Sequence, residues 1–304
     1  MEKLLSSFRM IALTVLVLST FITGGRLPTG GLHYTQEERA VYTETAKEAN
    51  GRGMLVLIGG GFDTDEHFAP LVDACVQHVN KETPHMLFIP TAHFDRLEDE
   101  EPVPARFAAA GCETDMLFVS KASPEEVREK IAWADIIYET GGNLRFLTDN
   151  WKEKGVYEAV KEAFDRGAAL IGVSSGAMCW ARQGWDDFGD EVVRVIGSFP
   201  FIGKAGAFEF RDCANLIPFC VCPHFDNTGW RMFSFEALKL DIPSLAIENG
   251  AAAVYENGEL RVISDRATPL RTAYLFCPAR GIAMLDVKTN GETAAALIGE
   301  YANK

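Results

Sequence analysis

The chain has 304 residues, of which 47% are hydrophobic and 24% are charged, and its formal net charge is −14. These proportions are typical of a globular protein and exclude wholesale disorder. A chain of this length buries about three quarters of its unfolded surface, so it needs neither disulfides nor a metal to fold. It contains no dense run of Lys and Arg, and nucleic acid is therefore not an expected partner.

The cysteines and the amino end point to different compartments. An odd count of seven cysteines in a long chain favours free thiols in a reducing compartment over a disulfide framework. Residues 10–22 form an apolar run behind Lys3 and Arg9, which is the outline of a signal peptide but is short for a membrane span. We therefore expect a cytoplasmic protein. The alternative is export or anchoring through residues 1–25, with membrane contact limited to residues 10–22.

Composition divides the chain into two regions. Residues 1–53 contain the apolar segment and a polar, Glu-rich linker with a short helix. The folded domain is predicted to begin at Met54 and to include residues 54–304. Near its carboxyl end, Asn257-Gly258 separates two short apolar runs and predicts a β-hairpin, so this portion is expected to be antiparallel.

Between these points strands and helices alternate. Apolar runs predict strands at residues 54–58, 85–90, 114–119, 135–139 and 168–173. Helices are expected at residues 67–80, 101–110, 151–166 and 177–182, and another opens at the capping box that Ser123 and Glu126 form. Such alternation predicts an α/β fold in three layers, in which helices cover both faces of a doubly wound, mostly parallel sheet.

The most informative turn is Gly172-Val173-Ser174-Ser175-Gly176, a G-x-S-x-G motif between a predicted strand and a predicted helix. In this context the motif forms an elbow that exposes Ser174 as a nucleophile, and the amide of Ser175 can bind an oxyanion. Another turn, Gly59–Gly61, matches neither a dinucleotide fingerprint nor a phosphate loop. We expect its Gly60 to form a floor of the substrate pocket.

A serine nucleophile needs a base and a group that orients it. His224 is the only histidine after Ser174, and it stands where an apolar strand meets a turn. Spacing does not choose the acid. Candidates before His224 are Asp186, Asp187, Asp190, Glu191, Glu209 and Asp212, and candidates after it are Asp226, Glu236, Asp241, Glu248 or a later acid.

The resemblance of the chain to a known family lies in four segments that occur in the same order: residues 135–147, 172–180, 222–226 and 245–254. With these segments the chain resembles the serine peptidase family that contains peptidase E (α-aspartyl dipeptidase) and cyanophycinase. The resemblance implies a fold similar to class I glutamine amidotransferases and hydrolysis of short peptides, with aspartyl peptides as one class. It implies a triad of Ser174, His224 and Glu248. Two departures are that Ser175 stands where the family has alanine and Thr140 where it has glycine. The remaining expected site residues are the oxyanion amides of Gly142 and Ser175 and the substrate contacts Gly60, Asn143, Asp186 and Asp187.

Other interpretations remain open at this point. An α/β-hydrolase-type esterase, or a non-catalytic protein that binds a small ligand on the same scaffold, would also fit the elbow. Cys213, Cys220, Cys222 and His224 could hold a metal, but their spacing matches no common zinc pattern, so neither metal nor cofactor is expected. The expected partner is a small peptide substrate, and the Phe-rich composition allows a homodimer.

Overall fold

The computed structural model describes residues 53–97, 102–187 and 208–302. All of them belong to one of the two compact units into which the chain divides, residues 36–304. The predicted leader and linker, the apolar run at 10–22 and the candidate acids Asp190 and Glu191 lie outside the described residues, and the domain boundary at Met54 stays a prediction. No helix in the described ranges is both long and apolar enough to cross a membrane.

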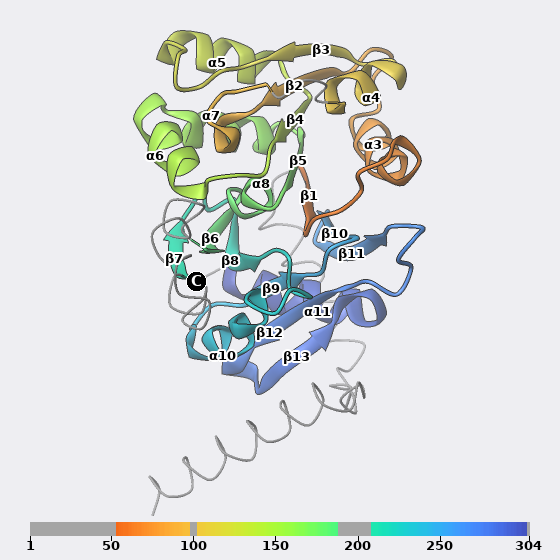
Figure 1. Cartoon of the computed structure of the whole chain (residues 1–304), viewed down its shortest axis with the longest axis vertical. Helices are drawn as coiled ribbons and strands as arrows, with labels where there is room; N and C mark the ends of the chain where they lie inside the picture. Colours follow the sequence, from red (N-terminus) through yellow and green to blue (C-terminus); the bar gives the residue numbers. More distant parts are fainter. Residues whose placement is uncertain (1–52, 98–101, 188–207, 303–304) are drawn as a thin grey trace, which may run out of the picture. The chain divides into compact units, whose positions relative to one another are not determined.

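A seven-stranded sheet contains the predicted parallel strands (Figure 1). Its order is β11-β10-β1-β5-β4-β2-β3, and the pairing is parallel from β1 to β3 and antiparallel at β10 and β11. The predicted hairpin is confirmed as β10 and β11. The strands are β1 (Met54–Ile58), β2 (His85–Ile89), β3 (Glu113–Met116), β4 (Ile136–Glu139), β5 (Ala169–Val173), β10 (Ala251–Glu256) and β11 (Glu259–Ser264).

Helices cover both faces of this sheet, as alternation within the strands requires. In β1, Met54, Val56 and Ile58 share a core cluster with residues of α3 and α4, whereas Leu55 and Leu57 share another with residues of α5, α6 and α7. This arrangement confirms the three-layer, doubly wound α/β fold. The helices are α3 (Asp65–Val79), α4 (Val103–Ala109), α5 (Pro124–Trp133), α6 (Leu144–Lys154) and α7 (Val156–Asp165).

A second, six-stranded sheet was not foreseen as a separate element. Its order is β13-β12-β9-β8-β6-β7, with β6, β8 and β9 parallel and the other pairings antiparallel. The strands are β6 (Ala181–Asp186), β7 (Glu209–Asp212), β8 (Ile217–Cys222), β9 (Ser244–Ile247), β12 (Ala273–Cys277) and β13 (Ile282–Asp286). The last helix, α11 (Val287–Ala302), packs against β11 and β12. The short helices are η1 (Thr91–His93), α8 (Ser175–Met178), η2 (Trp230–Met232), α10 (Phe233–Glu236), η3 (Ala237–Lys239) and η4 (Pro278–Arg280).

Two helix predictions are corrected. The helix expected at residues 177–182 is wrong, because α8 ends at Met178 and the chain continues into β6, where Gln183 and Gly184 pair with β8. The helix expected at residues 151–166 is replaced by α6 and α7. Gly155, whose φ is +73°, ends the first helix in a left-handed turn and precedes the second.

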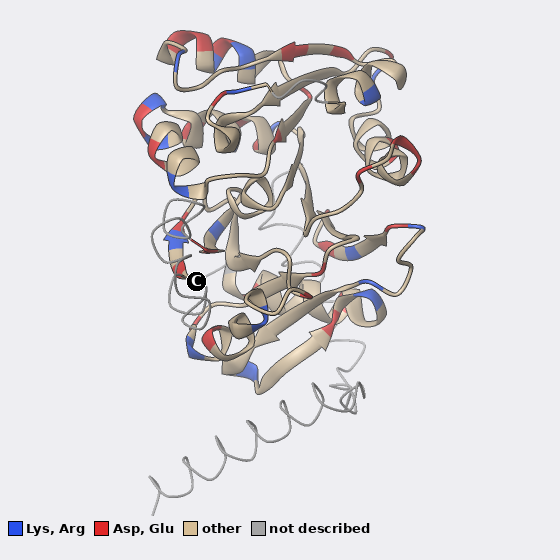
Figure 2. Ribbon diagram, viewed as in Figure 1, with Lys and Arg blue, Asp and Glu red and all other residues tan. Residues whose placement is uncertain are grey.

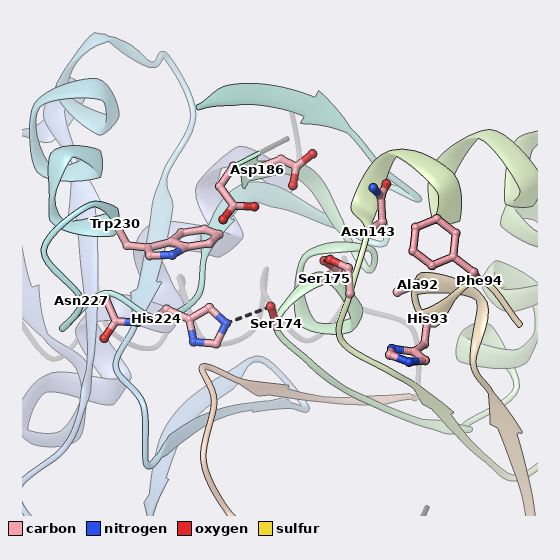
Figure 3. A pocket seen from close by; sticks show the side chains of 12 residues that line it. Ala92, His93, Phe94, Asn143, Ser174, Ser175, Asp186, His224, Asn227 and Trp230 are labelled. Atoms are coloured by element: carbon pink, nitrogen blue, oxygen red, sulfur yellow. Dashed lines mark hydrogen bonds between the residues drawn. The ribbon is translucent and has the colours of Figure 1, made fainter. Parts of the chain in front are cut away.

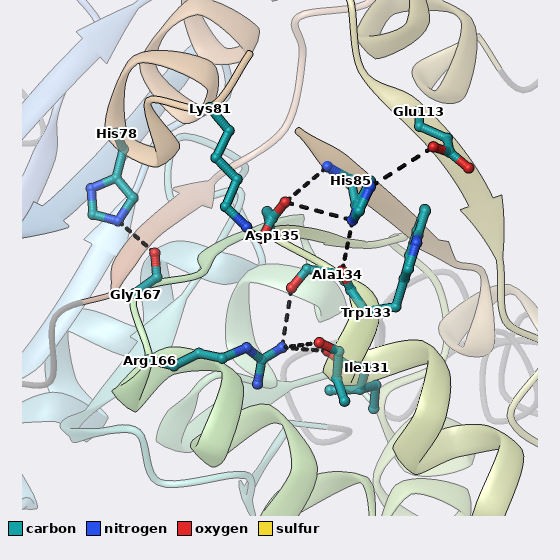
Figure 4. A network of polar contacts seen from close by, with 11 residues as sticks. His78, Lys81, His85, Glu113, Ile131, Trp133, Ala134, Asp135, Arg166 and Gly167 are labelled. Atoms are coloured by element: carbon teal, nitrogen blue, oxygen red, sulfur yellow. Dashed lines mark hydrogen bonds and ion pairs between the residues drawn. The ribbon is translucent and has the colours of Figure 1, made fainter. Parts of the chain in front are cut away.

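A polar network holds together the amino ends of β2 and β4 (Figure 4). Asp135 accepts a hydrogen bond from the His85 amide at 3.0 Å and another from Lys81 Nζ at 2.6 Å. Arg166 donates to three carbonyls at the end of α5, those of Ile131 at 2.6 Å and of Ala132 and Ala134 at 3.1 Å. One guanidinium therefore satisfies helix-terminal carbonyls that would otherwise lack partners.

Arg166→Ala is expected to lower the free energy of unfolding by about 1–3 kcal/mol, because partly buried carbonyls lose their donor. The control is Lys161→Ala, which removes an exposed ion pair with Asp165 and is expected to cost about 0.3–0.5 kcal/mol. Urea unfolding of the full chain measures both. Equal losses in the two variants would contradict the role given to Arg166.

Candidate active site

The elbow at Ser174 is held in a strained conformation. Ser174 lies between β5 and α8 with φ +56° and ψ −114°, a region that costs a non-glycine residue about 1–3 kcal/mol. A Cβ atom on Gly176 would lie 2.2 Å from the Glu139 carbonyl oxygen, and one on Gly172 would lie 2.3 Å from the Gly176 carbonyl oxygen. Both glycines of the motif are therefore required for the turn to close.

His224 lies directly beside this serine (Figure 3). Its Nε2 is 2.9 Å from Ser174 Oγ. The histidine follows β8, so the pair joins the carboxyl ends of strands from the two sheets. The His224 amide donates to the Gly59 carbonyl at 3.0 Å, and the Trp230 ring packs edge-on against the imidazole with centroids 5.3 Å apart. These contacts fix the ring where it can take a proton from the serine.

Asn249 occupies the other side of the imidazole. Its Oδ1 lies 2.7 Å from His224 Nδ1, while its Nδ2 and backbone amide donate to Asp226 Oδ1 at 2.8 and 2.7 Å. Because a carboxylate only accepts hydrogen bonds, the amide nitrogen of Asn249 must face Asp226 and its oxygen must face the ring. Nδ1 then carries the proton, and Nε2 is left to accept the proton of Ser174.

Glu248 lies next to this group without touching the imidazole. Its Oε2 accepts from the Thr272 amide at 3.1 Å, and its Oε1 lies 3.6 Å from Arg271 Nη1, which is 3.3 Å from Asp226 Oδ2. Burial raises the pKa of Glu248, against the opposing effects of the Thr272 amide and Arg271. The structure thus brings Ser174 and His224 together but gives the position at Nδ1 to Asn249, not to Glu248.

The two predicted oxyanion residues are in contact. Ser175 Oγ donates to the Gly142 carbonyl oxygen at 2.7 Å, and the next amide, of Asn143, donates to the Ala92 carbonyl at 2.7 Å. Both Gly142 and Ser175 line the same pocket as Ser174. The hydroxyl of Ser175 therefore orients the glycine turn opposite the nucleophile, and the oxyanion role of the two amides stays a prediction.

A buried acid supports this turn through Ala92, the residue whose carbonyl accepts from Asn143. Glu139 is fully buried at the end of β4, and its Oε1 accepts from the Ala92 amide at 2.9 Å. Burial raises the pKa of Glu139 well above its usual range, against the opposing effect of the Ala92 amide. It was not predicted as a site residue. Its place at the carboxyl end of a parallel strand is the signal that could have found it.

The pocket has a volume of about 410 Å³, within the range of small-ligand sites. Of the predicted substrate contacts, Asn143, Asp186 and Asp187 line it, and Asn143 Oδ1 also caps α6 by accepting from Phe146 N at 2.8 Å. Gly60 does not line the pocket and lies instead against the imidazole and Asn249. Lining residues that the sequence did not single out are Ala92, Phe94, Asn227 and Trp230, and His93 was noted only as a loop histidine.

The three cysteines that were considered as metal ligands are buried side chains of the protein interior. Cys213, Cys220 and Cys222 are buried free thiols, and burial raises the pKa of each. Cys222 Sγ contacts the carbonyls of Pro223 and Trp230. Within the described ranges no group of three or more His, Cys, Asp or Glu side chains is arranged to hold a metal.

Comparison with known proteins adds the family to this geometry. Residues 54–263, more than half of the chain, match peptidase family S51. The chain belongs to this family and is a serine-type peptidase by class. The match includes the elbow, His224 and the turn that carries Glu248 and Asn249.

Two individual relatives also carry the name of a peptidase. The chain is 26% identical over 218 residues to the uncharacterized peptidase YgaJ of Bacillus subtilis (strain 168), covering 70% of this chain and 88% of that protein. It is 28% identical over 191 residues to the uncharacterized peptidase PM1590 of Pasteurella multocida (strain Pm70), covering 60% and 86%. A solved peptidase from an acI-B1 Actinobacterium shares the fold, with a TM-score of 0.57 at 20% identity over 78% of this chain and 95% of that one. This is the class I glutamine amidotransferase-like fold.

Gly60→Ala is expected to separate His224 from Asn249, because the added Cβ would lie 2.1 Å from Asn249 Oδ1 and 2.8 Å from the imidazole. The expected result is at least a roughly tenfold slower reaction of Ser174 with a fluorophosphonate probe. Gly111→Ala is the matched control. Gly111 also has a positive φ, +89°, but a Cβ there meets nothing within 4 Å. Normal labelling of a folded Gly60→Ala variant would contradict this account.

Proposed function

We propose that this protein hydrolyses amide bonds in short peptides through a covalent acyl-enzyme on Ser174. The observation that carries the proposal is the 2.9 Å contact between Ser174 Oγ and His224 Nε2 at a strained elbow. Family membership supports the reaction class, and the small pocket supports a small substrate. Aspartyl peptides stay a prediction that a panel of dipeptides would test.

The reaction follows from the arrangement. His224 Nε2 takes the hydroxyl proton while Ser174 Oγ bonds to the amide carbon, and the carbonyl electrons move onto oxygen. The amides of Gly142 and Ser175 bind that oxyanion, with each donor worth about 2.7–4 kcal/mol of barrier. Collapse of the intermediate expels the amine, which receives the proton from Nε2. Water then repeats the sequence on the acyl-enzyme and releases the acid.

The orienting role in this proposal belongs to Asn249, not to Glu248. Asn249 contacts the imidazole, and Asp226 holds the amide in the one orientation that presents oxygen to Nδ1. Arg271 forms ion pairs with both Asp226 and Glu248, and so links the two acids. Glu248 in this arrangement supports the turn through Thr272.

A fluorophosphonate probe tests the nucleophile. The Ser174 oxygen displaces fluoride from phosphorus, so the folded full chain is expected to be labelled and Ser174→Ala is not. Ser175→Ala should still be labelled, because its hydroxyl points to the Gly142 carbonyl and is not the attacking group. Intact-mass spectrometry measures the label. Labelling that disappears only in Ser175→Ala would reverse the assignment.

The choice between Asn249 and Glu248 has a direct test. Asn249→Ala is expected to slow labelling and peptide turnover by roughly 10–100-fold, because the neutral imidazole loses the acceptor that sets its tautomer. Glu248→Gln keeps an oxygen for the Thr272 amide and is expected to change the rate by less than about threefold.

Circular dichroism confirms folding of both variants. A severe loss in Glu248→Gln together with a normal rate in Asn249→Ala would restore the triad of Ser174, His224 and Glu248.

A further inference from the structure

An exposed aromatic ring lines the pocket on the side of Ser174 away from His224. This ring belongs to Phe94, which follows η1, lines the same pocket as Ser174 and is 42% exposed. Figure 3 shows Ser174 between Phe94 and His224, with Asn143 next to the ring. A substrate bound at Ser174 therefore has an apolar surface available on this side of the nucleophile.

The backbone holds this ring in a conformation that a bulky residue rarely adopts. Phe94 has φ +59° and ψ +30°, and Asp95 has φ +51°, so two successive residues other than glycine are left-handed. The Phe94 amide closes the turn by donating to the Thr91 carbonyl at 2.9 Å. The Asp95 amide donates to the Pro90 carbonyl at 3.0 Å. Strain of this kind persists where the position of a side chain serves function, which makes Phe94 a candidate for contact with substrate.

Two further contacts keep the ring in place. The Asp95 carboxylate is only 2% exposed, and its Oδ2 accepts a hydrogen bond from the Ser120 amide at 2.6 Å, which ties the turn to the segment after β3. The Phe146 ring of α6 packs against Phe94 with centroids 4.9 Å apart and planes at 52°. Because the ring is already held in position, a ligand that packs on its exposed part loses little free energy to ordering it.

The reaction determines which part of a substrate meets this ring. His224 Nε2 gives its proton to the leaving amine, so the amine side of the scissile bond lies towards the imidazole. The acyl residue, which supplies the attacked carbonyl, then extends to the other side of Ser174, where Phe94 lies (Figure 3).

The charges near the ring do not favour an acidic acyl residue. The described residues that line the pocket include neither Lys nor Arg, which occur instead on covering helices such as α5 and α6 (Figure 2). The Arg96 guanidinium lies 5.8 Å from the centroid of the Phe94 ring, but Arg96 lines a separate, smaller cavity of about 150 Å³. The surface that Phe94 offers to an acyl residue is therefore mainly apolar.

We infer that this protein prefers substrates with an apolar acyl residue, whose aromatic or branched aliphatic side chain packs on Phe94. This inference rests on the proposed function and gives its substrate class. Phe94 is then a specificity-determining residue, because contact with its ring removes apolar surface of both partners from water. The cavity of about 410 Å³ has room for such a side chain beside the reacting carbonyl.

Hydrolysis of p-nitroanilides by the full chain tests this preference. The anilides of alanine, leucine, phenylalanine and aspartate are compared, each with a free and with an acetylated amino group, so that only the acyl residue differs within a series. In each reaction Ser174 Oγ bonds to the acyl carbon, the C–N bond breaks and p-nitroaniline leaves with the proton from His224. Its absorbance gives kcat/KM.

In at least one series, kcat/KM for the phenylalanine or leucine compound is expected to exceed that for the alanine compound by about tenfold or more, the discrimination of an apolar contact. The aspartate compound is expected to react no faster than the alanine compound. Phe94→Asn removes the ring and suits a left-handed backbone, and it is expected to bring the ratio close to one. Because the ratio is taken within one variant, a change in overall rate cancels.

Leu97→Ala is the matched control. Leu97 is 48% exposed and belongs to the same segment, but it lines the smaller cavity and not the pocket of Ser174, so the ratio is expected to stay high. The inference is overturned by a ratio close to one in the unchanged chain, by a ratio that survives Phe94→Asn, by equal losses in both variants, or by fastest hydrolysis of the aspartate compound. Hydrolysis of none of the anilides by the unchanged chain overturns the proposed function together with the inference.

Discussion

The contact between Ser174 and His224 depends on close approach of backbone segments at the ends of strands from both sheets. Gly176 lets the elbow pass against the Glu139 carbonyl, and Gly60 leaves room for the imidazole and Asn249. A Cβ at either place would overlap atoms of the site. The strain at Ser174, with φ +56°, persists because the surrounding packing holds the turn.

Buried and half-buried acids surround the reacting pair, and they differ in what they contact. Glu139, whose pKa burial raises, accepts a hydrogen bond from the Ala92 amide next to the glycine turn. Asp226 fixes the orientation of Asn249, and through it the tautomer of His224. Asp186 lines the pocket, and its buried Oδ2 lies 3.8 Å from Arg211 Nε. Acidic side chains thus support the loop at one position and orient the base at another, because burial and neighbouring groups differ at each position.

Much of the fold could be predicted from local patterns. The apolar runs placed the five parallel strands within a few residues, and Asn257-Gly258 placed the hairpin of β10 and β11. The errors were at 177–182 and at 151–166. In the first, pairing with β8 turns the chain into a strand, and in the second, Gly155 ends a helix. Pairing with a distant strand leaves little trace in the local sequence.

The sequence by itself determined the nucleophile elbow and the pair of Ser174 and His224, because the elbow needs its glycines at fixed spacing and only one histidine follows it. It also determined the family, since ordered motifs extend over most of the domain. Only the tertiary structure decided that Asn249 faces the imidazole while the adjacent Glu248 turns to Thr272 and Arg271. It also decided that Asp186 lines the pocket. Both outcomes depend on the turn after β9 and the pairing of β6, where a shift of the chain by one residue would turn a side chain to the opposite face of the sheet.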